Sequence, residues 1–382
     1  MRCETFRLGD ICTFIDYRGK TPPKTSNGIP LVTAKIIKNS MIQEPQEFIA
    51  ENYYNEWMRR GIPQKGDVIF TTEAPLGEVA RIKTDDKLAF AQRIIVLEPN
   101  TQQLNAGYLF YALQDIVLKN RIAARATGTT VIGIKAAELK KVEIDLPPLQ
   151  QQEKIADILS SLDDKIELNN KINENLERQA TALFNNFYDQ AETEISFTDV
   201  IQILGGGTPK TGESGYWGGK IPFFTPKDIG SPYTLNTEKT ITEAGLARCN
   251  SRLYPINTVF VTARGTVGKV GMAGVPMAMN QSCYALVGKG IHQLLVYCYT
   301  LKVIDRLRHK ASGAVFDAVT TKDFESEHIM RLPESIEKVF LCAAEPMYQA
   351  ILNNSIENQQ LAGLRDALLP KLISGEIEVS GI

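Results

Sequence analysis

The sequence repeats itself once, with a period of about 185–192 residues. Six pairs of segments match in the same order in both halves: Thr21–Thr25 with Thr208–Thr211, Gly28–Ile36 with Lys220–Asp228, Pro63–Thr71 with Pro255–Thr262, Ala89–Gln92 with Ala278–Gln281, Ala126–Gly128 with Ala311–Gly313, and Leu146–Pro147 with Leu332–Pro333. Solenoid repeats are far shorter, about 20–50 residues, so the pattern indicates two copies of a whole domain.

Each copy mixes strand and helix signals. Short β-branched or apolar runs follow turn residues and predict strands at Asp67–Thr71, Arg93–Leu97, Thr258–Thr262 and Ser282–Val287. Helical spacing of apolar residues predicts helices at Tyr108–Lys119 and Leu294–Arg308. Each copy is therefore expected to be an α+β domain with a mostly β core.

A different pattern follows each copy. Apolar residues at three-and-four spacing run through 150–188 and again through 347–373, which predicts two long helices that pack on each other. Pro346 should break the second helix or mark its start, and Pro370 should end or kink it. Leu168–Asn170 and Leu352–Asn354 repeat the same Leu-Asn-Asn motif.

These patterns predict four segments: a domain at 1–147, a helix at 148–188, a second domain at 189–335 and a second helix at 336–382. The expected fold class is α+β, with two repeated, mostly β domains separated by two long antiparallel helices in a coiled coil with pseudo-two-fold symmetry. Net charges of +3, −4, +2 and −3 over 1–149, 150–189, 190–336 and 337–382 alternate accordingly. A polyanion would prefer the domains and be repelled by the helices.

Two similar domains related by a two-fold axis fit the symmetry of double-stranded DNA, on which they would contact two different half-sites. The polar candidates for this contact lie in equivalent loops. In the first copy they are Arg18, Lys20, Thr21, Lys24, Thr25, Lys35, Gln92, Arg93, Thr129 and Lys135, and in the second Thr208, Lys210, Thr211, Lys227, Arg264, Lys269, Asn280, Gln281 and Lys322. Arg and Lys suit guanine or phosphate, Asn and Gln suit adenine, and Thr suits thymine or phosphate. The alternative is that they are ordinary turn residues.

The chain has no motif for catalysis of its own. Asp145–Leu149 resembles an adenine-methyltransferase motif but lacks its aromatic residue, and Leu204–Gly212 is glycine-rich without the lysine of a phosphate-binding loop. The three histidines and six cysteines are scattered, so neither catalytic residues nor metal ligands are expected.

No membrane span and no secretory signal is expected, and the chain is expected in the cytoplasm of a prokaryote.

The chain resembles the specificity subunits of type I restriction–modification enzymes over nearly all of its length. The segments that carry the resemblance are Glu357–Ile377, Leu146–Ala156, Gly207–Lys210, Tyr216–Trp217 and Ile221–Pro222. Glu334–Phe340 departs from the family, because it lacks the Pro-Pro-Leu run that opens the first helix.

The resemblance implies a non-catalytic subunit whose two domains each recognise half of a bipartite, asymmetric DNA target. It also implies two DNA methyltransferase subunits, which bind S-adenosylmethionine, and restriction/translocase subunits, which use ATP and Mg²⁺. The acidic helices are expected to bind these partners through Ile155, Leu159, Leu162, Ile166, Leu361, Leu364 and Leu368.

Two other functions stay open on the sequence. The first is a coiled-coil scaffold or interaction protein that does not bind DNA. The second is a fragment of a fused methyltransferase–nuclease, against which the missing cofactor and metal motifs count.

Overall fold

The structure is a computed structural model that describes residues 3–17, 21–230, 232–310 and 318–379. The candidates Arg18 and Lys20 and the repeat segment Ala311–Gly313 lie outside the described residues. The chain divides into two compact units, Met1–Lys165 with Leu361–Ile382 and Ile166–Gln360. Domain 1 is the globular part of the first unit, domain 2 is that of the second, and each unit also contains a segment of both long helices.

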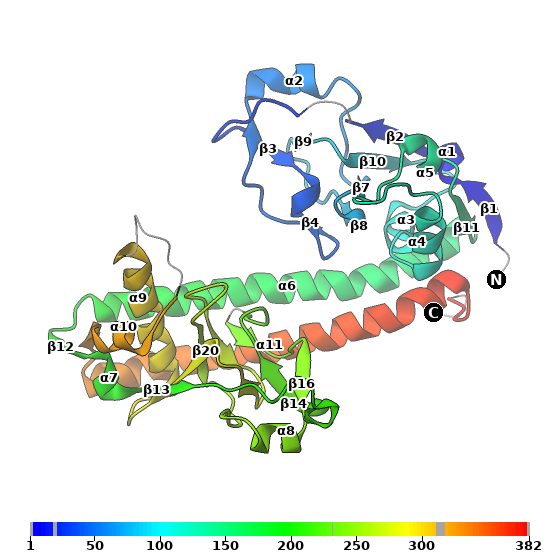
Figure 1. Ribbon diagram of the computed structural model, residues 1–382. Helices are drawn as coiled ribbons and strands as arrows, with labels where there is room; N and C mark the ends of the chain where they lie inside the picture. The colour runs from blue at the N-terminus through cyan, green and yellow to red at the C-terminus, as the bar shows by residue number, and fades with distance from the viewer. Residues whose placement is uncertain (1–2, 18–20, 231, 311–317, 380–382) are drawn as a thin grey trace. The chain divides into compact units, whose positions relative to one another are not determined.

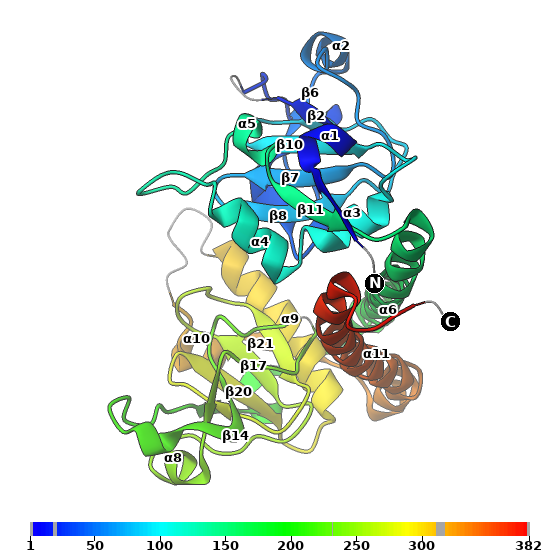
Figure 2. The ribbon, with the colours of Figure 1, turned by 90° about the vertical axis from the view of Figure 1, so that its right-hand side faces the viewer.

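Domain 1 is built on a four-stranded antiparallel sheet, with α3 and α4 along one side of it (Figure 2). The sheet order is β2 (Cys12–Asp16), β10 (Ile94–Pro99), β7 (Val68–Thr72) and β8 (Leu76–Arg81). A smaller sheet has the order β6 (Phe48–Ile49), β3 (Ile29–Val32) and β9 (Ala89–Phe90), and two pairs complete the domain, β1 (Glu4–Arg7) with β11 (Glu143–Leu146) and β4 (Ile37–Lys38) with β5 (Met41–Ile42). The helices are α1 (Leu8–Ile11), α2 (Tyr54–Trp57), α3 (Ala106–Ala112), α4 (Ile116–Ala123) and α5 (Ala136–Leu139), and the 3₁₀ turns are η1 (Ala34–Ile36) and η2 (Glu51–Tyr53).

The central strands of domain 1 separate two hydrophobic cores. Successive residues of a strand point to opposite faces of a sheet. Accordingly Phe70 and Ile95 join the core that contains α3 and α4, whereas Ile69 and Val96 join the core that contains β3 and β9. Because both faces are buried, these strands read as continuous apolar runs rather than alternating ones.

Domain 2 repeats this architecture. Its main sheet has the order β13 (Ile201–Gly205), β20 (Cys283–Gly288), β17 (Val259–Thr262), β18 (Val270–Ala273) and β15 (Tyr233–Thr234). The smaller sheet is β16 (Lys239–Ile241), β14 (Trp217–Phe224) and β19 (Ala278–Met279), and the pair is β12 (Thr193–Ser196) with β21 (His328–Arg331). The helices are α7 (Phe197–Val200), α8 (Glu243–Ala247), α9 (Gln293–Lys310) and α10 (Thr321–Glu325), and η3 is Ser214–Tyr216.

The predicted α+β class and the four predicted strands are confirmed, as β7, β10, β17 and β20. The helix predicted at Leu294–Arg308 is confirmed as α9. The single helix predicted at Tyr108–Lys119 is wrong, because the chain forms α3 and α4 with a break between them. The carboxylate of Asp115 accepts a hydrogen bond from the amide of Val117 at 2.9 Å and so starts a new helix at this point.

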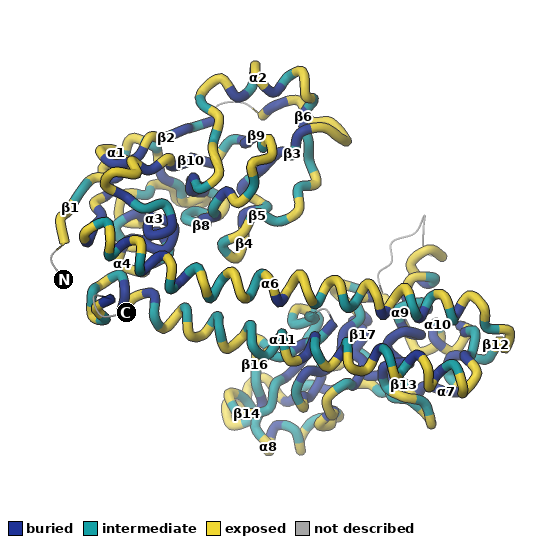
Figure 3. Tube along the Cα trace, turned by 180° about the vertical axis from the view of Figure 1, so that it is seen from behind, coloured by how far each residue is buried: buried dark blue, intermediate teal, exposed yellow. Residues whose placement is uncertain are grey.

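The two long helices are α6 (Leu149–Tyr188) and α11 (Glu334–Ser374), which run side by side (Figures 1 and 3). The prediction that Pro346 breaks or starts the second helix is wrong, and so is the prediction that Pro370 ends it, since α11 continues through both residues. A kink at Pro370 stays a prediction. A proline leaves the carbonyl four residues earlier without its helical donor. Those carbonyls belong to Cys342 and Asp366, which are exposed residues, so water can satisfy them.

The helices pack antiparallel in both units. In the first unit, Arg365 of α11 donates from Nη1 to Oδ1 of Asp163 on α6 at 2.7 Å. In the second unit, an asparagine layer joins them: Asn169 donates to Oδ1 of Asn358 at 2.9 Å, and Asn354 donates to Oδ1 of Asn173 at 2.8 Å. Asn169 is buried and the other three asparagines are partly buried. A polar layer within a helix–helix contact favours one register and orientation over others.

Each domain is fixed to its helix segments by its own core. In the first unit, Ile155 and Leu159 of α6 and Leu372 of α11 belong to the core of domain 1. In the second unit the contact is aromatic, and Phe184 packs edge-on against Tyr299 and Phe340 at centroid distances of 5.5 and 5.4 Å. No helix within the described ranges is long and apolar enough to cross a membrane.

Candidate nucleic-acid interface

Loops that follow four different strands or helices meet at one edge of domain 1. The strands β3 and β9 are parallel, so their carboxyl ends lie together, and the amide of Ala91 donates to the carbonyl of Val32 at 2.9 Å. The hairpin after β7 joins them, because the amide of Thr72 donates to the carbonyl of Arg93 at 2.9 Å. The loop before α5 adds a fourth segment, through a 2.9 Å hydrogen bond from Ile134 to Thr72.

Domain 2 has the same three backbone hydrogen bonds. Asn280 donates to Phe224 at 3.0 Å, Ala263 donates to Ser282 at 2.8 Å, and Val319 donates to Ala263 at 3.0 Å. We call this meeting point the strand-end junction: residues 33–35, 73–75, 91–93 and 127–135 in domain 1, and residues 225–227, 264–266, 280–282 and 318–322 in domain 2.

A buried threonine braces the hairpin beneath each junction. The Thr71 hydroxyl donates to the carbonyl of Pro75 at 2.7 Å and accepts from the amide of Glu78 at 2.9 Å. The Thr262 hydroxyl donates to the carbonyl of Thr266 and accepts from the amide of Lys269 at 2.9 Å. Both threonines are 0% exposed. The two junctions therefore share their backbone and its internal support.

The junction of domain 2 forms a cleft of about 520 Å³. Three predicted residues, Lys227, Arg264 and Asn280, line it together. Glu238 and Lys239, which were not among the predicted residues, line it as well. The cleft thus has three cationic side chains and one anionic one, which favours an anionic partner.

The charges in this cleft differ in their surroundings. Lys227 lies 3.9 Å from the carboxylate of Glu238. The ammonium of Lys239 lies 5.7 Å from the ring centroid of Trp217, a cation–π contact. No hydrogen bond or ion pair to the Arg264 guanidinium is found among the described residues, and Arg264 is exposed.

Two of the polar candidates beside the cleft are partly engaged. Oδ1 of Asn280 accepts from the amide of Ser282 at 3.0 Å, and Oε1 of Gln281 accepts from the hydroxyl of Thr208. The second bond places the Thr208 loop beside the junction, with Lys210 and Thr211 exposed farther along it. Beneath the junction, burial raises the pKa of the Cys283 thiol to about 12, so it stays protonated.

The junction of domain 1 has different side chains. Nε of Arg93 lies 2.9 Å from Oε1 of Glu73, and both side chains are close to half exposed. Gln92 precedes Arg93, and Lys35 is an exposed residue of the turn η1 that follows β3. Thr129 is exposed in the fourth loop, and Lys135 is the residue before α5.

The remaining candidates lie away from the junctions or at their margins. Lys24 is paired with Glu47 at 2.8 Å, next to Thr25 and the exposed Thr21. Lys269 lines a separate hollow of about 450 Å³. Lys322 lies on α10, after Val319.

The predicted partner-binding residues separate into two groups. Ile155 and Leu159 are 0% exposed and hold α6 to domain 1, so they have no surface to offer a partner. Five are partly or well exposed on α6 and α11: Leu162, Ile166, Leu361, Leu364 and Leu368. Leu364 is 49% exposed, so the partner-contact prediction now rests on this second group.

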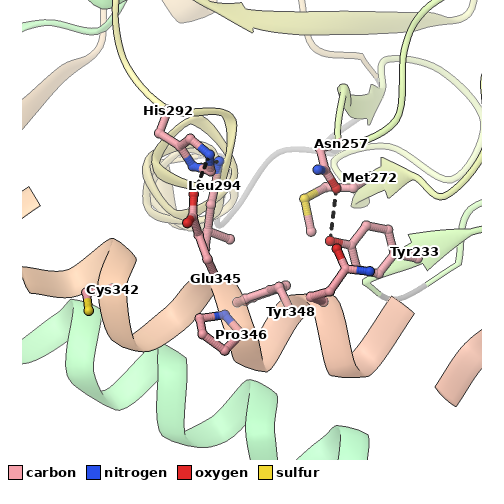
Figure 4. Close-up of a pocket in the computed structure, with 10 residues that line it drawn as sticks. Tyr233, Asn257, Met272, His292, Leu294, Cys342, Glu345, Pro346 and Tyr348 are labelled. Atoms are coloured by element: carbon pink, nitrogen blue, oxygen red, sulfur yellow. Dashed lines mark hydrogen bonds and ion pairs between the residues drawn. The ribbon is translucent and has the colours of Figure 1, made fainter. Parts of the chain in front are cut away.

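A further hollow of about 590 Å³ lies against α11 in the second unit (Figure 4). There His292 points toward Glu345, with Nε2 2.7 Å from Oε1, and the Tyr233 hydroxyl donates to Asn257 at 3.0 Å. None of the predicted DNA-binding residues lines this hollow.

Glu73, Glu238 and Lys239 were not predicted from the sequence. The sequence did contain a signal for Glu73. The repeat aligns Thr71 with Thr262, so Glu73 aligns with the predicted residue Arg264. Nothing in the sequence signals the other two, because β16 reaches the cleft through its pairing with β14.

Comparisons with known proteins agree with this architecture. The family described as type I restriction modification DNA specificity domain matches residues 2–178 and 192–339. The chain is 26% identical over 380 residues to the type I restriction enzyme MjaIX specificity subunit of Methanocaldococcus jannaschii, covering 92% of this chain and 87% of that one. It is 23% identical over 399 residues to the HindI specificity subunit of Haemophilus influenzae, covering 82% and 87%.

The fold has a solved counterpart. The crystal structure of the type I restriction–modification S subunit from M. genitalium superposes with a TM-score of 0.62 at 16% identity, covering 97% of this chain and 96% of that one. The family match spans both domains and most of α6. The chain therefore belongs to the type I restriction–modification specificity (S) subunits, the non-catalytic components that recognise the DNA target.

Proposed function

We propose that each domain of this subunit reads one half of a bipartite, asymmetric DNA target at its strand-end junction. The observation that carries the proposal is that the two junctions have the same backbone hydrogen bonds but different polar side chains. A common backbone would present both loops to DNA in the same way. Different side chains would then select different bases, which gives two unlike half-sites.

The two long helices would hold the two half-sites at a fixed spacing. The helices would also bind the partners. The net charge of −4 over 150–189 keeps this segment away from phosphates, and the exposed Leu162, Ile166, Leu361, Leu364 and Leu368 offer apolar contacts.

The partners proposed are two DNA methyltransferase subunits, which bring S-adenosylmethionine, and restriction/translocase subunits, which bring ATP and Mg²⁺. The complex would work where the chromosome is, in the prokaryotic cytoplasm. Substitution of Leu364 by Asp should weaken association with the methyltransferase and leave the recognised bases unchanged. A change of recognised bases instead would contradict the division between helices and domains.

The test is to map N6-methyladenine motifs in cells with and without this gene, together with its methyltransferase. A motif with two unlike halves and a constant gap is expected, and it should disappear with the gene. In binding assays the complex should lose affinity steeply as salt rises, since phosphate contacts release counterions. If neither a gene-dependent motif nor salt-sensitive binding is found, the scaffold function is favoured instead.

A further inference from the structure

Glu73 and Arg264 occupy the same place in the two junctions. Each follows the residue whose amide bonds to the β9–β10 or β19–β20 connection, Thr72 in domain 1 and Ala263 in domain 2. The residues whose carbonyls accept these hydrogen bonds also differ, since Arg93 in domain 1 corresponds to Ser282 in domain 2. Both junctions therefore contain one arginine, supplied from opposite sides.

In domain 1 the arginine is held by its neighbour. Glu73 contacts Nε of Arg93 at 2.9 Å, and no partner for its two terminal nitrogens is found among the described residues. Arg93 also has a φ of 73°, a left-handed conformation that is uncommon for residues other than glycine and clusters at functional sites. An exposed ion pair of this kind adds little to stability, so its effect is mainly to orient the guanidinium.

In domain 2 the arginine belongs to the hairpin after β17 and lines a formed cleft. Ser282, at the position of Arg93, is too short to hold it as Glu73 holds Arg93. Of the three cations that line the cleft, Lys227 is near Glu238 and Lys239 contacts Trp217, which leaves Arg264 available to a ligand.

We infer that Arg93 and Arg264 each read a guanine in the major groove, one in each half-site, and that Glu73 is a positioning residue for Arg93. This inference rests on the proposed function and names the bases that the two junctions select. A guanidinium offers only donors, in a rigid fork. Guanine is the base whose major-groove edge presents two acceptors, N7 and O6, whereas adenine presents one acceptor and one donor.

The reading arrangement differs between the halves. In domain 1, Glu73 fixes Arg93 through Nε, and the terminal nitrogens donate to N7 and O6. In domain 2, Arg264 is ordered only on binding, so the same contact costs more side-chain entropy. Guanine discrimination is therefore stricter in the half-site of domain 1.

The test is motif mapping in cells that carry the methyltransferase and one variant of this chain. Arg264→Lys keeps the charge but loses the fork, and it should lower the preference for guanine at one position of one half-site about tenfold to hundredfold. Arg93→Lys should do the same in the other half-site. Matched controls are Arg248→Ala and Arg59→Ala, exposed arginines outside the junctions, which should leave the motif unchanged.

Glu73 is tested by two variants. Glu73→Ala should relax the same position as Arg93→Lys by a smaller factor, and Glu73→Gln, which keeps an acceptor for Nε, should restore most of the preference. A merely structural effect of Glu73 would lower methylation at all sites and leave the base preference at that position unchanged.

Two outcomes overturn the inference. If Arg264→Lys and Arg93→Lys keep the wild-type motif, or weaken methylation equally at all sequences, the arginines contact phosphates rather than bases. If the relaxed positions are not guanines, the chemistry assigned is wrong. The proposed function fails separately, if wild-type protein yields no gene-dependent motif.

Discussion

Domains 1 and 2 are alike in backbone and unlike at their exposed edges. Both have a buried threonine under the hairpin and the same three hydrogen bonds between the loops. At the edge itself, Glu73 and Arg93 of one domain correspond to Arg264 and Ser282 of the other. The buried threonine and the backbone hydrogen bonds of the junction can therefore stay the same while its exposed side chains change.

The attachment of each domain to the long helices likewise combines a similar backbone with different side chains. Gln152, at the start of α6, is buried and accepts from the amide of Asn105 at 2.9 Å while donating to the carbonyl of Pro147 at 2.9 Å. At the start of α11, Glu337 instead accepts from Nε of Arg331 at 2.8 Å. The second helix lacks the Pro-Pro-Leu run that opens the first helix, and the ion pair between Arg331 and Glu337 lies at this place instead. Each helix nevertheless starts three residues after the preceding strand ends.

The largest predicted effect concerns the aromatic attachment of domain 2. Phe184→Ala should lower the free energy of unfolding by about 3–5 kcal/mol, because it removes a ring that packs on Tyr299 and Phe340. Urea denaturation measures this loss. Leu364→Ala, at a half-exposed position on α11, is the control and should change stability by less than about 1 kcal/mol. Equal losses in both variants would contradict the assigned attachment.

The shared support of the junctions predicts equal losses in the two domains. Thr71→Val and Thr262→Val each remove a buried hydroxyl that serves one amide and one carbonyl, so each should cost about 1–3 kcal/mol. Denaturation of the two variants in parallel tests the comparison. A large loss in one domain with none in the other would show that the hairpins are supported differently.

Substitutions of exposed residues at the two junctions should change DNA affinity rather than the free energy of unfolding. Lys227→Ala removes one cation from the cleft and should weaken DNA binding several-fold, with a reduction of the salt slope by about one. Lys35→Ala is the corresponding change in domain 1. A salt titration of the complex measures both, and an unchanged slope would exclude a phosphate contact.

The smallest predicted effect is a pH dependence in the second unit. Burial raises the pKa of Glu177, the Tyr297 hydroxyl opposes this by donating to it at 3.3 Å, and Glu174 adds to the rise. The folded protein therefore binds this proton more tightly than the unfolded chain, and stability gains as pH falls from neutral toward the ordinary glutamate range. Glu177→Gln should remove this gain, which denaturation at pH 7 and pH 5 would detect. An identical pH dependence in wild type and variant would contradict it.

The sequence predicted what depends on periodicity and repetition. Apolar spacing predicted α6 almost to the residue, and the repeat predicted that Lys227, Arg264 and Asn280 belong to corresponding loops. Two results depend on tertiary context that no local pattern records. The course of α11 through Pro346 depends on the exposure of Cys342, four residues earlier. The meeting of the loops depends on parallel pairing of β3 with β9 and of β14 with β19.

The most direct test of independent half-site reading is a domain exchange. Residues 191–332, which lie between α6 and α11, would be replaced by the corresponding domain of a family member with a different target, and the methylated motif would be mapped in cells with the matching methyltransferase. One half-site and the gap should stay as in wild type while the other half-site becomes that of the donor. A change in both half-sites, or in neither, would contradict the proposal that each domain reads its own half.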